Sequence, residues 1–448
     1  MPGLRNKELK SQIKQVWRLS LPAILTQITT IAMQYIDSAM VGALGANASA
    51  SIGLVASTTW LFNGIPYAVA AGFSVQVAHS VGAKNSKHTK NIVKHGLVTA
   101  IIMSLMVCAL GLLISKPLPV LLGGNSDINY DASLYFMTFA LMLPFFQMNC
   151  LASSYLQCAG DMVTPSVLNA IMCVLDVVFN AFFIPRYKVL GAGIGTALAC
   201  AVTSVFMMAF CYLRNKELSL LKSKKSKFSF NIIKTAFKIG TPVAVQEIAM
   251  CGAMVATTMI VAPLGAVAIA ANSFAITAES LCYMPGYGIG NAATTLVGRS
   301  FGAKDFKTAK RYGNICTAMG GIFMGLTGAI MMIVCPFVFM ILTPVTEVQN
   351  LATEVLRIGL LAESLFGISI VAAGALRGTG DTFVPSVMNL GSIWVVRIGL
   401  ALLLVKPLGL HGVWIAMATE LCIRGLLLLY RQIKSKYYKG ETYVEKSY

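Results

Sequence analysis

Long apolar stretches separated by short polar segments run through the whole chain. Each stretch holds roughly 20 or more mostly apolar residues, the length that an α-helix needs to cross a bilayer. The alternating pattern of membrane β-strands is absent, so helices are the spanning structure that the pattern indicates. We therefore predict an all-α membrane protein with twelve transmembrane helices, at residues 17–44, 51–78, 92–114, 131–156, 163–184, 190–213, 235–263, 267–297, 313–342, 350–375, 383–405 and 410–431.

Composition agrees with a lipid environment. Of 448 residues, 56% are hydrophobic and 12% are charged, whereas soluble domains carry roughly 25% charged residues. The basic start followed by residues 17–44 looks like a signal peptide, but the apolar run is too long and contains Asp37, so we expect a retained first helix. The expected location is the cell membrane, inner or plasma.

The net charge of +18 is placed unevenly. Most Lys and Arg residues, Arg377 among them, lie in one alternating set of polar segments. The opposite set holds only Lys116, Arg186, Lys188 and Lys406. By the positive-inside rule, this asymmetry predicts that both termini are cytoplasmic. Aromatic residues are not interleaved with the charges, which argues against nucleic-acid binding.

The two halves of the chain repeat each other. Pro22 recurs as Pro242, and at the same shift Gly160-Asp161 recurs as Gly380-Asp381. Each half has six predicted spans, so the halves run in parallel and form two pseudo-symmetric six-helix bundles. We predict an N-lobe at residues 1–215, a basic cytoplasmic linker at 216–234, and a C-lobe with a basic tail at 235–448. Two bundles around a central cavity are typical of transporters that work by alternating access.

Carboxylates within the first-half spans indicate an ion site, because a charge at the bilayer centre costs on the order of 2.5–3.5 kcal/mol. Asp37 lies mid-helix, and Asp176 and Asn180 are four residues apart on one helix face. Thr196 adds a hydroxyl. These oxygens could bind Na⁺, most directly at Asp37, Asp176 and Asn180, or the two carboxylates could share a proton. The alternative is a polar network that only holds helices together.

The second half carries Glu247, Glu279 and Glu363 within spans. These residues are candidates for binding a cationic substrate or for a second proton site. Pairing with Arg397, or hydration of the pore, is the alternative explanation.

Other acidic residues have simpler explanations. Glu420 lies near a cytoplasmic helix end, one turn before Arg424, so we expect these two to pair. Asp161 and Asp381 follow glycines at matched turns, where helix capping is sufficient to explain an aspartate. The eleven cysteines form no CxxC pair and no Cys/His cluster, so neither a resident metal nor another cofactor is expected beyond a coupling ion.

Four segments resemble the multidrug and toxic compound extrusion (MATE) family: residues 37–42, 191–196, 298–303 and 373–381, the last followed by Pro385. The resemblance extends over essentially the whole chain. It implies a V-shaped exporter of amphipathic or cationic organic compounds, driven by Na⁺ or H⁺ antiport. Asp37 matches the family's coupling aspartate on the first helix, and Thr196 matches its threonine on the sixth.

Two departures from the family pattern stand out. Many members have Asn and then Asp on the fifth helix, whereas here Asp176 precedes Asn180. Members of the NorM branch carry acidic residues about one turn after the positions of Glu247 and Glu363. This difference favours a DinF-like or related bacterial branch.

A flippase for lipid-linked oligosaccharides is the alternative function of similar fold. It would be expected to carry more cationic groups, whereas only Arg357 and Arg397 lie within spans. Enzyme motifs such as DDxxD, HExxH and GxSxG are absent, as is the GxxxxGK[ST] loop of ATP-driven pumps. We therefore expect a non-enzymatic, ATP-independent monomer whose partners are small-molecule substrates and the bilayer.

Overall fold

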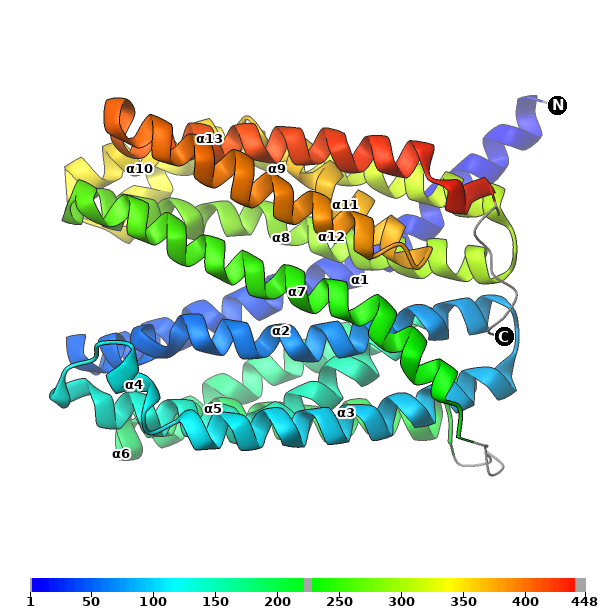
Figure 1. Ribbon diagram of the computed structural model, residues 1–448, viewed down its shortest axis with the longest axis horizontal. Coiled ribbons are helices and arrows are strands. Elements are labelled where there is room, and N and C mark those ends of the chain that lie inside the picture. Colours follow the sequence, from blue (N-terminus) through cyan, green and yellow to red (C-terminus); the bar gives the residue numbers. More distant parts are fainter. Residues whose placement is uncertain (1, 221–227, 440–448) are drawn as a thin grey trace. The chain divides into compact units, whose positions relative to one another are not determined.

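The computed structural model describes residues 2–220 and 228–439, and within them the regular structure is entirely helical (Figure 1). These residues form two compact units. The first unit comprises residues 28–244, and the second comprises residues 2–27 together with 245–439. The boundaries of the predicted lobes stay a prediction, since the units divide the chain in a different way.

The first unit contains most of the helices of the first half and the start of α7. In it, α5 packs against α2, α3 and α6. Its elements are the last part of α1 (Pro2–Gly42), α2 (Ala46–Gly82), α3 (Ser86–Ile114), the short α4 (Leu118–Leu121), α5 (Ser126–Cys158), α6 (Val163–Ala209), the π-helix η1 (Phe210–Arg214) and the beginning of α7 (Phe230–Val261).

The second unit contains the first part of α1, the remainder of α7 and the other helices. In it, α8, α9 and α11 pack against one another, and α11 also packs against α13. Its further elements are η2 (Ala262–Leu264), α8 (Ala266–Gly302), α9 (Phe306–Leu342), α10 (Thr346–Leu360), α11 (Glu363–Gly378), α12 (Phe383–Gly391), the π-helix η3 (Ser392–Ile398), α13 (Gly399–Lys434) and η4 (Lys436–Lys439).

These helices accommodate the twelve predicted spans. Nine helices of the described chain are long and apolar enough to cross a bilayer, and α10 with α11, bent by 54°, supplies a further span. Two of the nine cover two predicted spans each, because the helix breaks at Lys188 within α6 and at Gly409 within α13. Many exposed side chains are large and apolar, such as Ile341, which is 86% exposed. This surface fits lipid rather than water.

The repeat is visible in backbone detail. Lys84 and Lys304, which occupy matching positions in the two halves, both adopt a left-handed φ, of 55° and 60°. Each is followed by a side chain that caps the next helix: Asn85 accepts a hydrogen bond from the His88 backbone N–H, and Asp305 accepts one from that of Thr308. The same helix–turn–helix geometry therefore occurs in both halves.

Small residues allow the divided helices to pack tightly within their units. In the first unit, a Cβ atom at Gly72 would overlap the Ala236 carbonyl of α7. In the second unit, a Cβ atom at Gly288 would lie 2.6 Å from the Ile24 backbone nitrogen of α1. Close backbone approach at small residues is a common way for membrane helices to associate.

Candidate functional site

Asp37, Asp176 and Asn180 meet inside the first unit. Asp37 comes from α1, and the other two lie one turn apart on α6. The Asn180 Nδ2 atom donates to Asp37 Oδ1 at 2.8 Å and to Asp176 Oδ2 at 3.3 Å. The predicted arrangement of Asp176 and Asn180 on one helix face is confirmed, and one amide joins both carboxylates.

This cluster holds two carboxyl groups that form no ion pair among the described residues. Asp176 and Asn180 are both fully buried. Asp176 Oδ1 and Asn180 Oδ1 accept no hydrogen bond within the described chain. No Lys or Arg forms an ion pair with Asp37 or Asp176 among the described residues. Buried charges are normally paired, so the site has both the charge and the free oxygens to bind a proton or a small cation.

The break in α6 shapes this site. After Lys188 the chain turns, and the following segment returns along its own first part, so that Thr196 lies beside Asp176. A Cβ atom at Gly195 would overlap the Asn180 amide oxygen. Glycine is therefore required at this position for the two parts of α6 to approach. The Thr196 hydroxyl itself donates to the Ala192 carbonyl at 3.1 Å.

In the second unit, Glu420 is the centre of an ion-pair network. Its Oε2 atom is 2.7 Å from Arg397 Nη2, and its Oε1 atom is 3.1 Å from Arg424 Nε. Ser392 donates a further hydrogen bond of 2.7 Å. The expected pairing of Glu420 with Arg424 is confirmed. The sequence interpretation missed Arg397 as the second partner, which the π-helix η3 presents.

The other second-half candidates lie in different surroundings. Glu279 is 4% exposed and Glu363 is fully buried, and they are close enough to interact electrostatically. Glu279 Oε1 and both Glu363 oxygens accept no hydrogen bond in the described chain. Glu247 is partly exposed, and its charged neighbour is Arg377. Sequence reasoning had grouped Arg377 with the cytoplasmic loop charges and so missed this proximity.

The alternative pairing of these three glutamates with Arg397 is not observed. Arg397 binds Glu420 instead, and no ion pair is formed by Glu247, Glu279 or Glu363 within the described residues. The structure thus brings the first-half candidates together in one bonded cluster, whereas the second-half candidates share no hydrogen bond.

A family assignment follows from the sequence as a whole. The sequence model of the MatE family matches residues 22–182 and, a second time, residues 242–403. The chain belongs to the MatE family. The two matches begin at Pro22 and Pro242, the pair of prolines that defines the shift of the internal repeat. This MatE chain is a multi-pass membrane transporter.

Curated relatives agree over nearly their full length. The chain is 26% identical to the probable multidrug resistance protein NorM of Thermotoga maritima, over 97% of this chain and 95% of that protein. It is also 26% identical to the probable NorM of Oceanobacillus iheyensis, over 94% of this chain and 97% of that protein. These relatives give no support to the expected DinF-like branch, because they are named NorM.

Solved structures show the same fold. A crystal structure of a MATE protein in complex with MaL6 has a TM-score of 0.90 at 20% identity, covering 96% of this chain and 97% of that one. A mutant of the Vibrio cholerae MATE transporter VcmN has a TM-score of 0.91 at 18% identity, covering 97% and 100%. The predicted all-α fold of about twelve helices is thereby confirmed.

Proposed function

We propose that this MatE chain exports amphipathic or cationic organic compounds in exchange for Na⁺ or H⁺, by alternating access between its two bundles. The observation that carries the proposal is the cluster of Asp37, Asp176 and Asn180, in which two carboxylates share one amide and form no ion pair within the part of the chain that the structure describes. Such a site binds a cation at low cost in one state and releases it in another. The names of the curated relatives, multidrug resistance proteins, support the substrate class and do not favour the flippase alternative.

Each residue of the cluster has a distinct part in the proposed cycle. Asp37 and Asp176 supply the charge, and Asn180 holds the two carboxylates at hydrogen-bond distance. The free oxygens of Asp176 and Asn180, with Thr196 close by, complete the ligand set for Na⁺, or one carboxylate takes a proton. The membrane potential contributes about 2.3 kcal/mol per charge per 100 mV, which drives the exchange without ATP.

The second unit contributes the substrate site or a second proton site in this proposal. Glu279 and Glu363 are buried with unpartnered oxygens, and Glu247 is accessible beside Arg377. Because none of these glutamates forms an ion pair among the described residues, they are available to neutralise a cationic substrate. Cytoplasmic termini and a monomeric state complete the proposed arrangement.

Efflux from energised vesicles tests the proposal. Wild-type protein is compared with Asp37→Asn under separate Na⁺ and pH gradients, with a fluorescent organic cation as substrate. Asp127→Asn is the matched control, because it makes the same chemical change at an exposed residue of the first unit. We expect wild type and D127N to move the dye under one of the two gradients, and D37N to lose at least tenfold in rate.

Either of two results would refute the proposal. If D37N transports as fast as D127N under the effective gradient, the cluster only stabilises the helix packing. If neither gradient moves any of a panel of organic cations through wild-type protein, organic-cation efflux is wrong as the function.

A further inference from the structure

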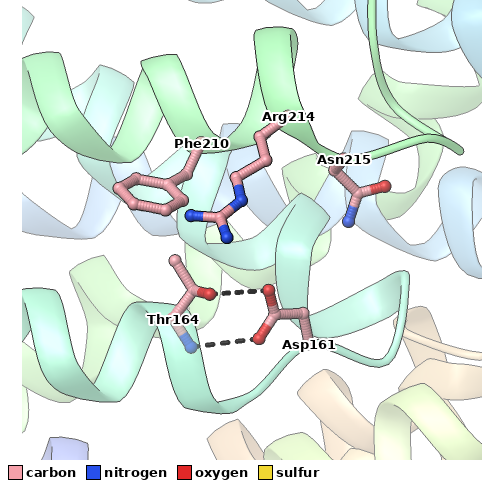
Figure 2. A pocket seen from close by; sticks show the side chains of 5 residues that line it. All are labelled: Asp161, Thr164, Phe210, Arg214 and Asn215. Carbon is pink, nitrogen blue, oxygen red and sulfur yellow. Dashed lines mark hydrogen bonds between the residues drawn. The ribbon is translucent and has the colours of Figure 1, made fainter.

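A polar pocket of about 300 Å³ lies in the first unit, and none of its lining residues belongs to the Asp37 cluster. Figure 2 shows the five residues that line it: Asp161, Thr164, Phe210, Arg214 and Asn215. They come from the turn before α6, from its first turn, and from η1 with the residue after it. By the predicted topology, these segments are cytoplasmic ends of spans.

Opposite charges face each other across this pocket without touching. The Arg214 guanidinium points towards Asp161 and Thr164 (Figure 2), yet Arg214 forms no ion pair among the described residues. It is positioned over the Phe210 ring, with 5.3 Å between Cζ and the ring centroid. Asp161 accepts hydrogen bonds from the Thr164 backbone N–H at 3.0 Å and hydroxyl at 2.7 Å. A carboxylate can accept further bonds, so both charges remain available.

Asn215 adds a donor on the same side as Arg214. Its Oδ1 atom accepts from the backbone N–H groups of Glu217 and Leu218, at 3.0 and 3.3 Å. These bonds fix the orientation of the amide, and Nδ2 has no acceptor in the described chain. One wall therefore offers guanidinium and amide donors, and the other offers a carboxylate. A ligand that fits both walls carries an anionic group close to a cationic group.

The surroundings of the pocket identify the class of ligand. Large apolar side chains beside the lining residues are exposed: Val163 by 59%, Phe206 by 53% and Leu213 by 56%. Such side chains at the end of a spanning helix face acyl chains. We propose that this pocket binds the head group of phosphatidylethanolamine, with the phosphate at Arg214 and Asn215 and the primary ammonium at Asp161. A primary ammonium has three N–H donors for a carboxylate, whereas the quaternary ammonium of phosphatidylcholine has none.

The repeat provides an internal comparison. At the matched turn of the second half, Asp381 is bonded directly to Arg431, at 2.8 and 3.0 Å. In that half a side chain of the protein already supplies the opposite charge, so no ligand is needed. The gap between Asp161 and Arg214 is thus specific to the first half.

Native mass spectrometry of the full chain in detergent tests this proposal. The protein is titrated with phosphatidylethanolamine, phosphatidylcholine or phosphatidylglycerol that carry the same acyl chains. We expect wild type to bind phosphatidylethanolamine about tenfold more tightly than phosphatidylcholine. Asp161→Asn should abolish this preference while its remaining oxygen still accepts from the Thr164 backbone N–H, and Arg214→Gln should weaken phosphatidylethanolamine and phosphatidylglycerol about tenfold.

Arg186→Gln is the matched control. Arg186 also lies over a phenylalanine ring, that of Phe182 at 3.8 Å, but it donates to a carbonyl and faces no carboxylate in the described chain. R186Q should bind phosphatidylethanolamine as wild type does. Thermal unfolding of each variant within a few degrees of wild type confirms that the fold is intact.

Three outcomes would overturn the proposal. Wild type could bind the three lipids equally, or R186Q could weaken phosphatidylethanolamine as much as R214Q does. Free phosphoethanolamine could bind as tightly as the lipid, which would assign the pocket to a soluble zwitterion. A negative result in this lipid-binding experiment would not change the interpretation of the efflux experiment on Asp37.

Discussion

The buried carboxyl groups of the two halves differ in whether arginine side chains pair with them. In the first unit, Asp37 and Asp176 share the amide of Asn180 and have no cation among the described residues. In the second unit, Glu420 forms ion pairs with both Arg397 and Arg424. The first arrangement has no ion-pair partner among the described residues, whereas in the second the chain itself supplies arginines that balance the charge of Glu420.

This difference is independent of the repeated scaffold. At the shift that relates Pro22 to Pro242, the residues Asp37, Asp176 and Thr196 correspond to Thr257, Val396 and Ala416. Glu420 likewise corresponds to Cys200. The turns, caps and prolines are therefore repeated, and the buried charges are not. One repeated scaffold therefore carries two unrelated polar centres, which is consistent with the proposal that coupling and substrate binding take place in different halves.

The largest effect on stability is expected when the ion pairs of Glu420 are removed. Glu420→Gln leaves Arg397 and Arg424 without their carboxylate and should lower the free energy of unfolding by about 3–5 kcal/mol. Asp176→Asn removes one of two like charges and keeps an oxygen for Asn180, so it should cost no stability. Denaturant unfolding in detergent measures both variants. Equal losses in the two would show that the centres do not differ as described.

A smaller effect is expected when the geometry of the Asp37, Asp176 and Asn180 cluster is changed and its carboxyl groups are kept. Gly195→Ala places a methyl group against the Asn180 amide and should reduce coupled efflux about tenfold, because Asn180 then loses its bond to Asp37. Gly391→Ala is the control in the second half, since nothing lies within 4 Å of its Cβ position. Vesicle efflux rates compare them. A normal rate for G195A would contradict the positioning role of Asn180.

The smallest effect concerns the matched helix caps. Hydrogen bonds from Thr308 hold the pKa of Asp305 below its usual value of 3.8, whereas Asn85 is a neutral cap. Because the folded pKa is lowered, the contribution of Asp305 to stability is complete above pH 4, roughly, and is lost as the pH falls through the folded pKa. Asp305→Ala should cost about 1 kcal/mol at neutral pH.

The pH dependence separates the two caps. Asp305→Asn should remove the acid-side loss attributable to Asp305, and Asn85→Ala should cost a similar amount at every pH. Unfolding free energies of each variant, measured between about pH 3 and 6, test this difference. A loss for N85A that changes with acid as it does for D305A would refute the assignment.

Local pattern was sufficient to predict the spans and the first site. Apolar length located the helices, and the four-residue spacing of Asp176 and Asn180 placed them on one face, which the structure confirms. The grouping of Asp37 with these two residues was a hypothesis based on its position within a span, because no local spacing links residues on different helices. The functional roles of these residues stay predictions.

Pairings that depend on packing could not be predicted from the sequence. Arg397 lies 23 residues before Glu420, and its reach depends on the π-helix that carries it, which no sequence periodicity indicates. The proximity of Arg377 to Glu247 likewise depends on where α7 and α11 lie within the second unit. Helix breaks at Lys188 and Gly409 were predicted only as gaps between spans, without the continuous hydrogen-bonded geometry that merges the helices.

The division of α1 and α7 between the units has a consequence for biosynthesis. The first unit comprises residues 28–244, so it cannot close until the ribosome has passed the central segment and released the start of α7. Residues 2–27 emerge first but belong with helices that are made after residue 245. At about 5–20 residues per second, this segment waits more than ten seconds for its partners. During synthesis, residues 2–27 therefore lack their contacts with α8 and α9 until these two helices have been made.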